Sequence, residues 1–361
     1  MRLLGNLDCE ARWAGAALPG AVQRRISLYA TLLTACAPDG DDRPEIWVPA
    51  EVDAARLIAH PRWAPPVVRA PAHVPLARNP GGDPAGFAPG EGPSRSGPRP
   101  AESMPPDALP GAFDLAWADP AAAAANDRSR ALAIAGELGV ALPGARVVAS
   151  LAELDAHLSA HFAAHCAGSG GQPWICKARW TAAGRDRARG TGSALVGELR
   201  TRISRMLERF GPLVFEPWLD RVLDLGVCGE VTAGGEVRLL EPHRIATDPR
   251  GGFLGIELSP RLDPGVAEPL CAVARAAAVR LAAQTGYRGR FAIDAFVHRP
   301  PGSAGHRLHP LCEINARHSF GWIAHALARR LGIRRLGFDA PPPGATVLIA
   351  PGPDRVTAWC A

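Results

Sequence analysis

The sequence lacks the features of several large protein classes. No apolar run approaches the roughly 18 uninterrupted residues that a membrane span needs. Asp8, Glu10 and Arg12 interrupt the first residues, so we predict no secretory signal. Eight cysteines occur without a C-x-x-C pair, which argues against a zinc knuckle and a disulfide framework. We therefore expect a soluble, cytoplasmic protein with no membrane partner.

Two nucleotide-binding signatures are also missing. The sequence contains no G-x-x-x-x-G-K-[ST] segment, and no G-x-G-x-x-G follows a predicted strand. These absences exclude a P-loop enzyme and a dinucleotide-binding domain of the usual kind. Nothing in the sequence brings a Ser-His-Asp or Cys-His arrangement together.

Lysine is nearly absent. Of the 40 basic residues, Lys177 is the single lysine. Arginine supplies the positive charge elsewhere, so this lysine indicates a place that needs a compact ammonium. The alternative is that a lysine occurs there by chance. Residues 177–209 hold Lys177 and eight arginines against three acids, a local excess of +6. Such concentration favours a polyphosphate site over a nucleic-acid-binding face.

The length of 361 residues exceeds what one hydrophobic core usually serves. We predict a small α/β lobe at 1–78, a Pro/Gly-rich flexible linker at 79–111, a main domain at 112–332 and a C-terminal extension at 333–361. Pro and Gly make up 16 of the 33 linker residues. The main domain should divide into a first lobe at about 126–212 and a second lobe at 213–332.

Periodicity and turn residues predict the elements of the main domain. Helices are expected at 126–140, 151–165, 195–210, 264–285 and 319–332. Strands are expected at 174–178, 213–219, 291–297 and 308–315, with two more in 222–246 that meet at Gly234 and Gly235. In the amino-terminal lobe, 45–60 should form a short strand, a turn and a helix. The fold class is α+β.

Lys177 lies in an otherwise apolar strand, where an unpaired ammonium would cost several kcal/mol. Its partner is either a nucleotide phosphate or a carboxylate, Glu216 or Asp294. The loop 179–192 follows and offers Gly184, Gly190 and Gly192 together with Arg185, Arg187 and Arg189. It suits a lid over phosphates, although a solvated arginine loop is the simpler interpretation.

Glu216 and Pro217 interrupt the strand at 213–219, which indicates an edge strand with free backbone groups. Such a backbone could bind adenine, and Asp224 could bind ribose. An ordinary edge strand explains the pattern equally well. The possible apolar walls of an adenine pocket are Phe215, Trp218 and Leu219.

A hairpin centred on residues 303 and 304 would place Asp294 directly opposite Glu313. Asn315 would share their face, because side chains alternate along a strand. Two acids at this separation repel unless a cation or a shared proton intervenes, so we predict a magnesium site. The alternative is an acid pair neutralised by Arg290 or Arg317.

The histidines offer less. His157, His161 and His165 recur on one helix face, and their Ala-rich surroundings favour a partly exposed helix surface over a metal site.

The order of these motifs resembles the ATP-grasp superfamily. NDRSRALAIAGELGVALPG is similar to the segment with a basic residue for the α-phosphate, WICKARWTAAGRDRARG to the second phosphate-binding lysine and its lid, and FEPWLDRVLDLGV to the adenine hinge. DAFV followed by CEINARHSFGWIAHAL resembles the metal-binding acid and the E-x-N-x-R signature.

The resemblance implies two α+β lobes that clasp ATP, preceded by a small α/β lobe. It also implies roles for individual residues. Arg128, Lys177, Glu216, Leu219 and Asp224 would bind the nucleotide; Asp294, Glu313 and Asn315 would bind Mg²⁺ or Mn²⁺; Lys177 and Arg317 would be catalytic.

The implied activity is an ATP-dependent ligase. It would activate a carboxylate as an acyl phosphate for attack by an amine, and it would release ADP and phosphate. Small carboxylates and amines, such as amino acids or peptides, would be the substrates, without nucleic acid. Arg244 is a further candidate for holding a carboxylate, against an ion pair with Glu241 or Asp248. The alternatives are a phosphotransferase acting on a hydroxyl and a nucleotide-binding regulator. The sequence indicates no oligomeric state.

Overall fold

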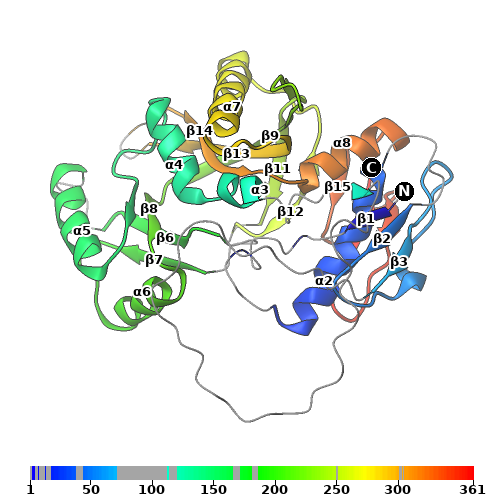
Figure 1. Ribbon diagram of the computed structural model, residues 1–361, viewed down its shortest axis with the longest axis horizontal. Helices are drawn as coiled ribbons and strands as arrows, with labels where there is room; N and C mark the ends of the chain where they lie inside the picture. Colours follow the sequence, from blue (N-terminus) through cyan, green and yellow to red (C-terminus); the bar gives the residue numbers. More distant parts are fainter. Residues whose placement is uncertain are drawn as a thin grey trace, which may run out of the picture.

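The computed structural model describes residues 2–4, 7, 13, 18–37, 44–70, 112–113, 120–165, 171–180, 186–248, 251–300, 303 and 305–361. These residues form helices and three sheets, so the predicted α+β class is confirmed (Figure 1). The predicted linker at 79–111 lies outside the described residues.

A small parallel sheet forms near the amino terminus, in the order β3-β2-β1-β4. The 45–60 prediction was half right, because the strand forms but the helix is a single 3-10 turn. The elements are β1 (Arg2–Leu4), α2 (Gly20–Ala30), η1 (Thr31–Cys36), β2 (Glu45–Trp47), η2 (Ala54–Arg56), β3 (Val67–Arg69) and β4 (Ala112–Phe113).

An antiparallel sheet in the order β5-β8-β6-β7 carries the predicted lysine strand. Its elements are β5 (Arg146–Val148), α5 (Leu151–His165), β6 (Pro173–Ala178), β7 (Arg187–Thr191), α6 (Gly197–Phe210) and β8 (Leu213–Pro217). One face packs on helices α5 and α6 around Trp174, Ile203 and Phe215, each at most 1% exposed. The other face carries Lys177 of β6 and Glu216 of β8.

Two predictions for this sheet were wrong. The strand before Pro217 is central, because β8 pairs with both β5 and β6. Proline is tolerated there because pairing with β5 ends at Phe215, two residues earlier. In addition, the last part of the predicted 179–192 loop is strand β7.

A nine-stranded sheet forms the rest of the body, in the order β14-β13-β9-β11-β12-β15-β17-β16, with β10 beside β9. Leu225 and Val227 on one face pack against α4 and α7, whereas Cys228 on the other face contacts the start of α8. The strands are β9 (Asp220–Val231), β10 (Val237–Leu239), β11 (His243–Thr247), β12 (Phe253–Glu257), β13 (Gly289–Arg299), β14 (Arg307–Asn315), β15 (Arg335–Gly337), β16 (Thr346–Ile349) and β17 (Ala358–Cys360). The helices are α3 (Pro120–Ala125), α4 (Arg128–Glu137), α7 (Pro264–Thr285) and α8 (Phe320–Leu331).

Two features of this sheet differ from expectation. Residues 222–246 contribute three strands where two were predicted, although the turn at Gly234 and Gly235 is present. Residues 333–361 supply β15, β16 and β17 to the same sheet. These strands share a hydrophobic core with α8 and with residues 28–63 of the amino-terminal part. The end of the chain therefore fixes the amino-terminal sheet to the body.

Gly190 should not tolerate a side chain. A Cβ atom there would lie 2.1 Å from Cζ2 of Trp174, whose indole is 1% exposed. We expect Gly190→Ala to lower the free energy of unfolding by about 1–3 kcal/mol through overpacking. Gly136 in α4 is exposed, and a Cβ atom there would have no other heavy atom within 4 Å. Gly136→Ala should therefore raise the free energy of unfolding by about 0.5–1 kcal/mol. Urea unfolding of both variants measures the contrast, and a neutral Gly190→Ala would contradict the packing described.

Candidate active site

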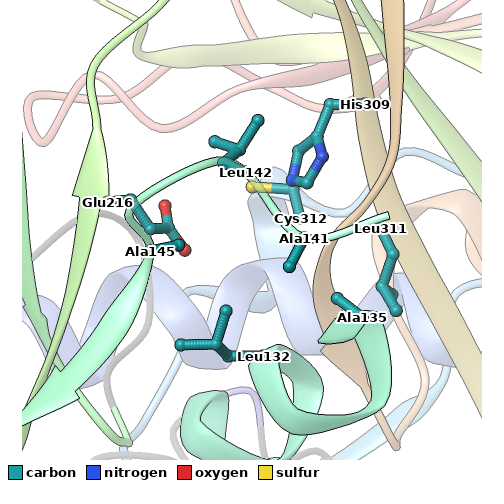
Figure 2. A pocket seen from close by; sticks show the side chains of 9 residues that line it. All are labelled: Leu132, Ala135, Ala141, Leu142, Ala145, Glu216, His309, Leu311 and Cys312. Carbon is teal, nitrogen blue, oxygen red and sulfur yellow. The ribbon is translucent and has the colours of Figure 1, made fainter. Parts of the chain in front are cut away.

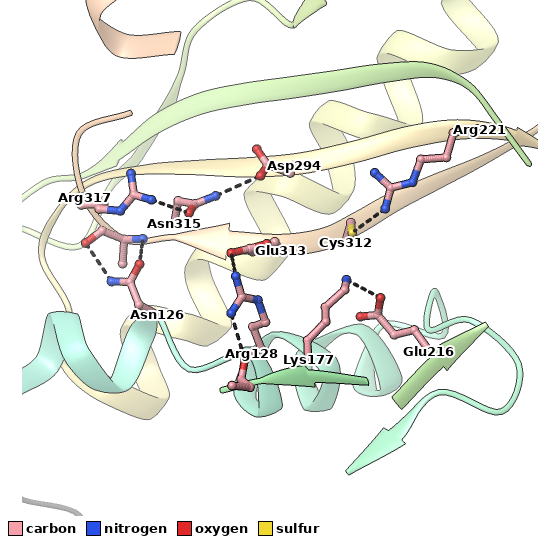
Figure 3. Close-up of polar contacts among 12 residues, drawn as sticks. Asn126, Arg128, Lys177, Glu216, Arg221, Asp294, Cys312, Glu313, Asn315 and Arg317 are labelled. Atoms are coloured by element: carbon pink, nitrogen blue, oxygen red, sulfur yellow. Dashed lines mark hydrogen bonds and ion pairs between the residues drawn. The ribbon is translucent and has the colours of Figure 1, made fainter. Parts of the chain in front are cut away.

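The face of the β5-β8-β6-β7 sheet that α5 and α6 do not cover lies opposite one face of the nine-stranded sheet. Charged side chains of the two sheets meet between them (Figure 3). Strands β6 and β8 contribute Lys177 and Glu216, and β13 and β14 contribute Asp294 and Glu313. Arg128 at the start of α4 lies between the two groups. The structure thus brings together residues separated by up to 185 positions.

The predicted strand register is confirmed at its most important point. Asp294 pairs with Glu313, and Ala292 pairs with Asn315. The Asn315 amide donates to Asp294 Oδ2 at 3.1 Å, and Arg317 donates to Asn315 Oδ1 at 3.1 Å. The two carboxylates and the amide form one patch, with Arg317 at its edge.

Burial and the neighbouring Glu313 raise the pKa of Asp294 to about 7, against the opposing effects of Arg317 and the Asn315 hydrogen bond. Glu313 accepts a hydrogen bond from Arg128 at 2.8 Å. Arg128 therefore contacts Glu313 directly, whereas Arg317 donates to Asn315 and the Arg290 guanidinium lies beside His318.

The donor set suits magnesium. Two carboxylates and an amide oxygen are hard ligands, and magnesium is usually held by one or two carboxylates together with substrate phosphates. Within the part of the chain that the structure describes, no three His, Cys, Asp or Glu side chains gather as a metal site.

Arg128 connects the two sheets. One guanidinium nitrogen donates to the backbone oxygen of Ala178 at 2.9 Å, and another to Glu313. Asp127 caps the amino terminus of α4 by accepting from the Ser129 N–H at 2.9 Å, and Arg179 donates to the same carboxylate. Arg128, the residue predicted to bind the α-phosphate, therefore contacts β6 at Ala178, next to Lys177.

Lys177 has the anionic partner that its buried position requires. Its Nζ lies 2.5 Å from Glu216 Oε2, and both side chains are 13% exposed. Burial lowers the pKa of the ammonium, but the Glu216 carboxylate, aided by Cys312 and Glu313, raises it above its usual value. Burial raises the pKa of Glu216, but the Lys177 ammonium, together with His309 and Arg221, brings it below its usual value. The pair is ionised, and Glu216 is one of the two carboxylates that the ion-pair alternative named.

The hinge between β8 and β9 brings a residue that the sequence did not single out. Arg221 donates to Asp224 Oδ1 at 3.1 Å, and its guanidinium lies 4.1 Å from the centre of the Phe296 ring. Thr247 donates to the other Asp224 oxygen at 3.2 Å. Asp224 is therefore held in place, and Leu219 lies half-buried between β8 and β9.

The predicted walls of an adenine pocket need correction. Phe215 is fully buried among Trp174, His157 and His161 on the opposite face of its sheet. Alternation along β8 explains this, because Glu216 points into the cleft and its neighbour must point away. Trp218 stays at the hinge, with the Arg189 guanidinium 3.4 Å from its ring centre.

A small pocket, partly open to solvent, is bordered by Glu216 of the ion pair (Figure 2). Its polar lining consists of Glu216, His309 and Cys312, and its apolar lining includes Leu132 and Leu142. Burial lowers the pKa of His309 to about 4, so its imidazole is neutral at pH 7. His309 and Cys312 carry no sequence signal, because a three-residue bulge opposite Ala295 decides their direction.

Other sequence candidates lie away from this site or are buried. Arg244 forms an ion pair with Glu257 at 3.6 Å, whereas the sequence suggested Glu241 or Asp248. Both side chains are about half exposed. His161 is 7% exposed against Phe215, so the expectation of a partly exposed histidine face was wrong for it. Arg185 lies outside the described residues.

No protein-family model matches the chain, and no curated protein matches it in sequence. Similar solved structures include N5-carboxyaminoimidazole synthetase from Staphylococcus aureus with ADP, at 14% identity over 55% of this chain and 46% of that one, with a TM-score of 0.41. D-alanyl-alanine synthetase A from Vibrio cholerae is 12% identical over 59% and 62% of the chains, with a TM-score of 0.44.

The biotin carboxylase domain of 2-oxoglutarate carboxylase from Hydrogenobacter thermophilus, with MgADP and bicarbonate, is 15% identical over 65% and 61% of the chains, with a TM-score of 0.46. The chain spans about half the length of two carboxyaminoimidazole synthetases, 46% and 51%. Among the described residues, none of the helices is long and apolar enough to cross a membrane.

The buried carboxylate pair should make stability depend on pH. Folding raises the pKa of Asp294 to about 7, so its ionisation destabilises the metal-free protein as pH rises from about 4 to about 7. Asp294→Asn removes this charge, and we expect it to raise the free energy of unfolding at pH 8 by on the order of 2 kcal/mol in chelator. The gain should shrink toward zero near pH 4. Equal gains at pH 5 and pH 8 in chemical unfolding would contradict the charge repulsion.

Proposed function

We propose that this chain is an ATP-dependent ligase of the ATP-grasp type. It activates a carboxylate as an acyl phosphate, and an amine then displaces the phosphate to form an amide. The supporting observation is the arrangement of charge: the Asp294–Glu313 pair faces the Lys177–Glu216 pair, with Arg128 between them. A bound polyphosphate and its magnesium require cations and metal-binding oxygens around one space. Lys177 and Arg128 would supply the cations, and the side chains of Asp294, Glu313 and Asn315 would supply the oxygens.

Lys177 and Arg128 bind the phosphates of ATP. Each is paired with a carboxylate, so phosphate oxygens compete with Glu216 for the ammonium and with Glu313 for the guanidinium. Asp294, Glu313 and Asn315 would hold Mg²⁺ or Mn²⁺, which neutralises phosphate charge when bound. Glu216 and Leu219 border the adenine, and Asp224, oriented by Arg221 and Thr247, faces the ribose hydroxyls.

The chemistry requires no covalent attachment to the protein. A carboxylate oxygen attacks the γ-phosphorus, and the bond to the bridging oxygen breaks with its electron pair on ADP. The amine nitrogen then attacks the carbonyl carbon, phosphate leaves, and the amine loses its proton. Arg317, held through Asn315, lies where it can stabilise negative charge on the acyl phosphate or its oxyanion.

The metal assignment predicts a ligand effect on stability. ATP with magnesium should raise the melting temperature strongly, and ATP in chelator only weakly, because the carboxylates repel phosphates without the cation. Glu313→Gln should remove most of the difference. Glu257→Gln is the matched control on the same sheet, half exposed and paired with Arg244, and should preserve it. Equal stabilisation of the unmutated protein with and without magnesium would refute the metal site.

The single lysine predicts a sharp effect on turnover. Lys177→Arg should fold and yet lose at least about 99% of ADP release, because a planar guanidinium cannot take the place of a compact ammonium between Glu216 and phosphate. Arg200→Lys, an exposed pair with Asp155, is the control and should keep full turnover. ADP release is measured with amino acids and small peptides, and hydroxylamine traps the acyl phosphate. Full turnover by folded Lys177→Arg would reject the assignment, whereas phosphorylated product without trapping would indicate a phosphotransferase.

A further inference from the structure

Asn126 joins the turn between α3 and α4 to the end of β14. Its side chain is 6% exposed. The side-chain oxygen Oδ1 accepts from the Ala316 N–H at 2.9 Å, and the side-chain nitrogen Nδ2 donates to the Ala316 carbonyl oxygen at 3.2 Å (Figure 3). The two residues are 190 positions apart in the chain. One buried side chain thus binds both backbone polar groups of a distant residue.

Ala316 lies one residue beyond the end of β14, whose last residue is Asn315. Ala316 is fully buried, and a buried backbone N–H or C=O without a partner costs free energy. The amide of an asparagine side chain carries a donor and an acceptor side by side, as the edge of a neighbouring strand does. Asn126 therefore holds the backbone immediately after β14 in place.

The two neighbours of Ala316 in the chain belong to the acid patch. Asn315 donates to Asp294, and Arg317 donates to Asn315. The Ala316 N–H belongs to the peptide group shared with Asn315, and the Ala316 carbonyl belongs to the one shared with Arg317. Because peptide groups are planar, the two hydrogen bonds from Asn126 fix the backbone from which both side chains start.

Asn126 is itself anchored at the end of α3. Its Nδ2 also donates to the Ala122 carbonyl oxygen at 2.7 Å, and its backbone N–H donates to the same oxygen at 3.0 Å. The second residue after it is Arg128, which reaches the acid pair. The same turn therefore positions Arg128 directly and Arg317 through the Ala316 backbone.

We propose that Asn126 is a positioning residue that holds Asn315 and Arg317 in the geometry that carboxylate activation needs. This inference rests on the proposed function, since it is the ligase reaction that gives Asn315 and Arg317 their roles. Asn126 acts through the Ala316 backbone. A displacement of about 1 Å that originates away from the reacting atoms can lower turnover about 100-fold.

The first measurement is hydrogen exchange at the Ala316 amide, in the full chain without nucleotide. Asn126→Ala removes the acceptor of this N–H, so we expect its exchange to become at least about tenfold faster. Asn126→Ser, whose short side chain leaves room for water, should give the same result and serves where Asn126→Ala does not fold. Thr357→Val is the matched control. It removes a buried hydrogen bond to the Ile349 backbone and should leave exchange at Ala316 unchanged.

The second measurement is the kcat for ADP release by the folded variants. We expect Asn126→Ala to lower it by about 10–100-fold and Thr357→Val to preserve it. Because Asn126 acts through Arg317, the loss in the double variant Asn126→Ala/Arg317→Ala should be smaller than the product of the two single losses. A general weakening of the fold would make the losses multiply.

Unchanged exchange at Ala316 in a folded Asn126 variant would overturn the inference, and so would losses of turnover that multiply. Failure of the ligase proposal has a different signature. If the unmutated protein releases no ADP while Asn126→Ala accelerates exchange at Ala316, the ligase is rejected, and the hold of Asn126 on the segment from Asn315 to Arg317 is supported.

Discussion

Strand pairing forces two carboxylates together, and the rest of the site follows from that constraint. Asp294 and Glu313 are directly opposed partners in β13 and β14, so neither can withdraw without breaking the ladder. Two buried acids at about 5 Å raise the free energy of the fold unless positive charge approaches. Arg128 reaches Glu313 from α4, and Arg317 acts on Asp294 through Asn315. In the proposed function, a bound cation would complete this neutralisation.

The pairing of charges without ligand explains how such a cleft can fold. A buried charge without a partner costs several kcal/mol, and each cation here has a carboxylate at hydrogen-bond distance. Under the proposed function, nucleotide binding would exchange partners. Phosphates would replace Glu216 and Glu313 at the two cations, and a metal would replace Arg128 at Glu313. Affinity is consequently a difference between two sets of ion pairs, which makes it sensitive to metal and to pH.

What the sequence could predict depended on how local each interaction is. The Asp294–Glu313 pairing was predicted from one hairpin turn, but nearer that turn the strands pair two residues out of the predicted register, and the bulge opposite Ala295 restores it at Asp294. The Lys177 partner was predicted from the cost of an unpaired ammonium. Phe215 was misplaced although alternation would have set it opposite Glu216. The position of Arg221 over Phe296 and the placement of 333–361 in the main sheet join segments far apart in the chain. No periodicity within either segment carries that information, so only the structure could supply it.

The position of Lys177 gives a reason for lysine in a chain that otherwise uses arginine. Arg128 and Arg179 each make two contacts that require a fork: Arg128 joins Ala178 to Glu313, and Arg179 contacts both oxygens of Asp127. Lys177 lies between them in sequence, in a strand paired on both sides, and its ammonium meets a single Glu216 oxygen. A second fork there would have to share the space that Arg128 already fills beside Ala178. A compact charge leaves that space to the phosphate, which is the physical argument for one lysine among arginines.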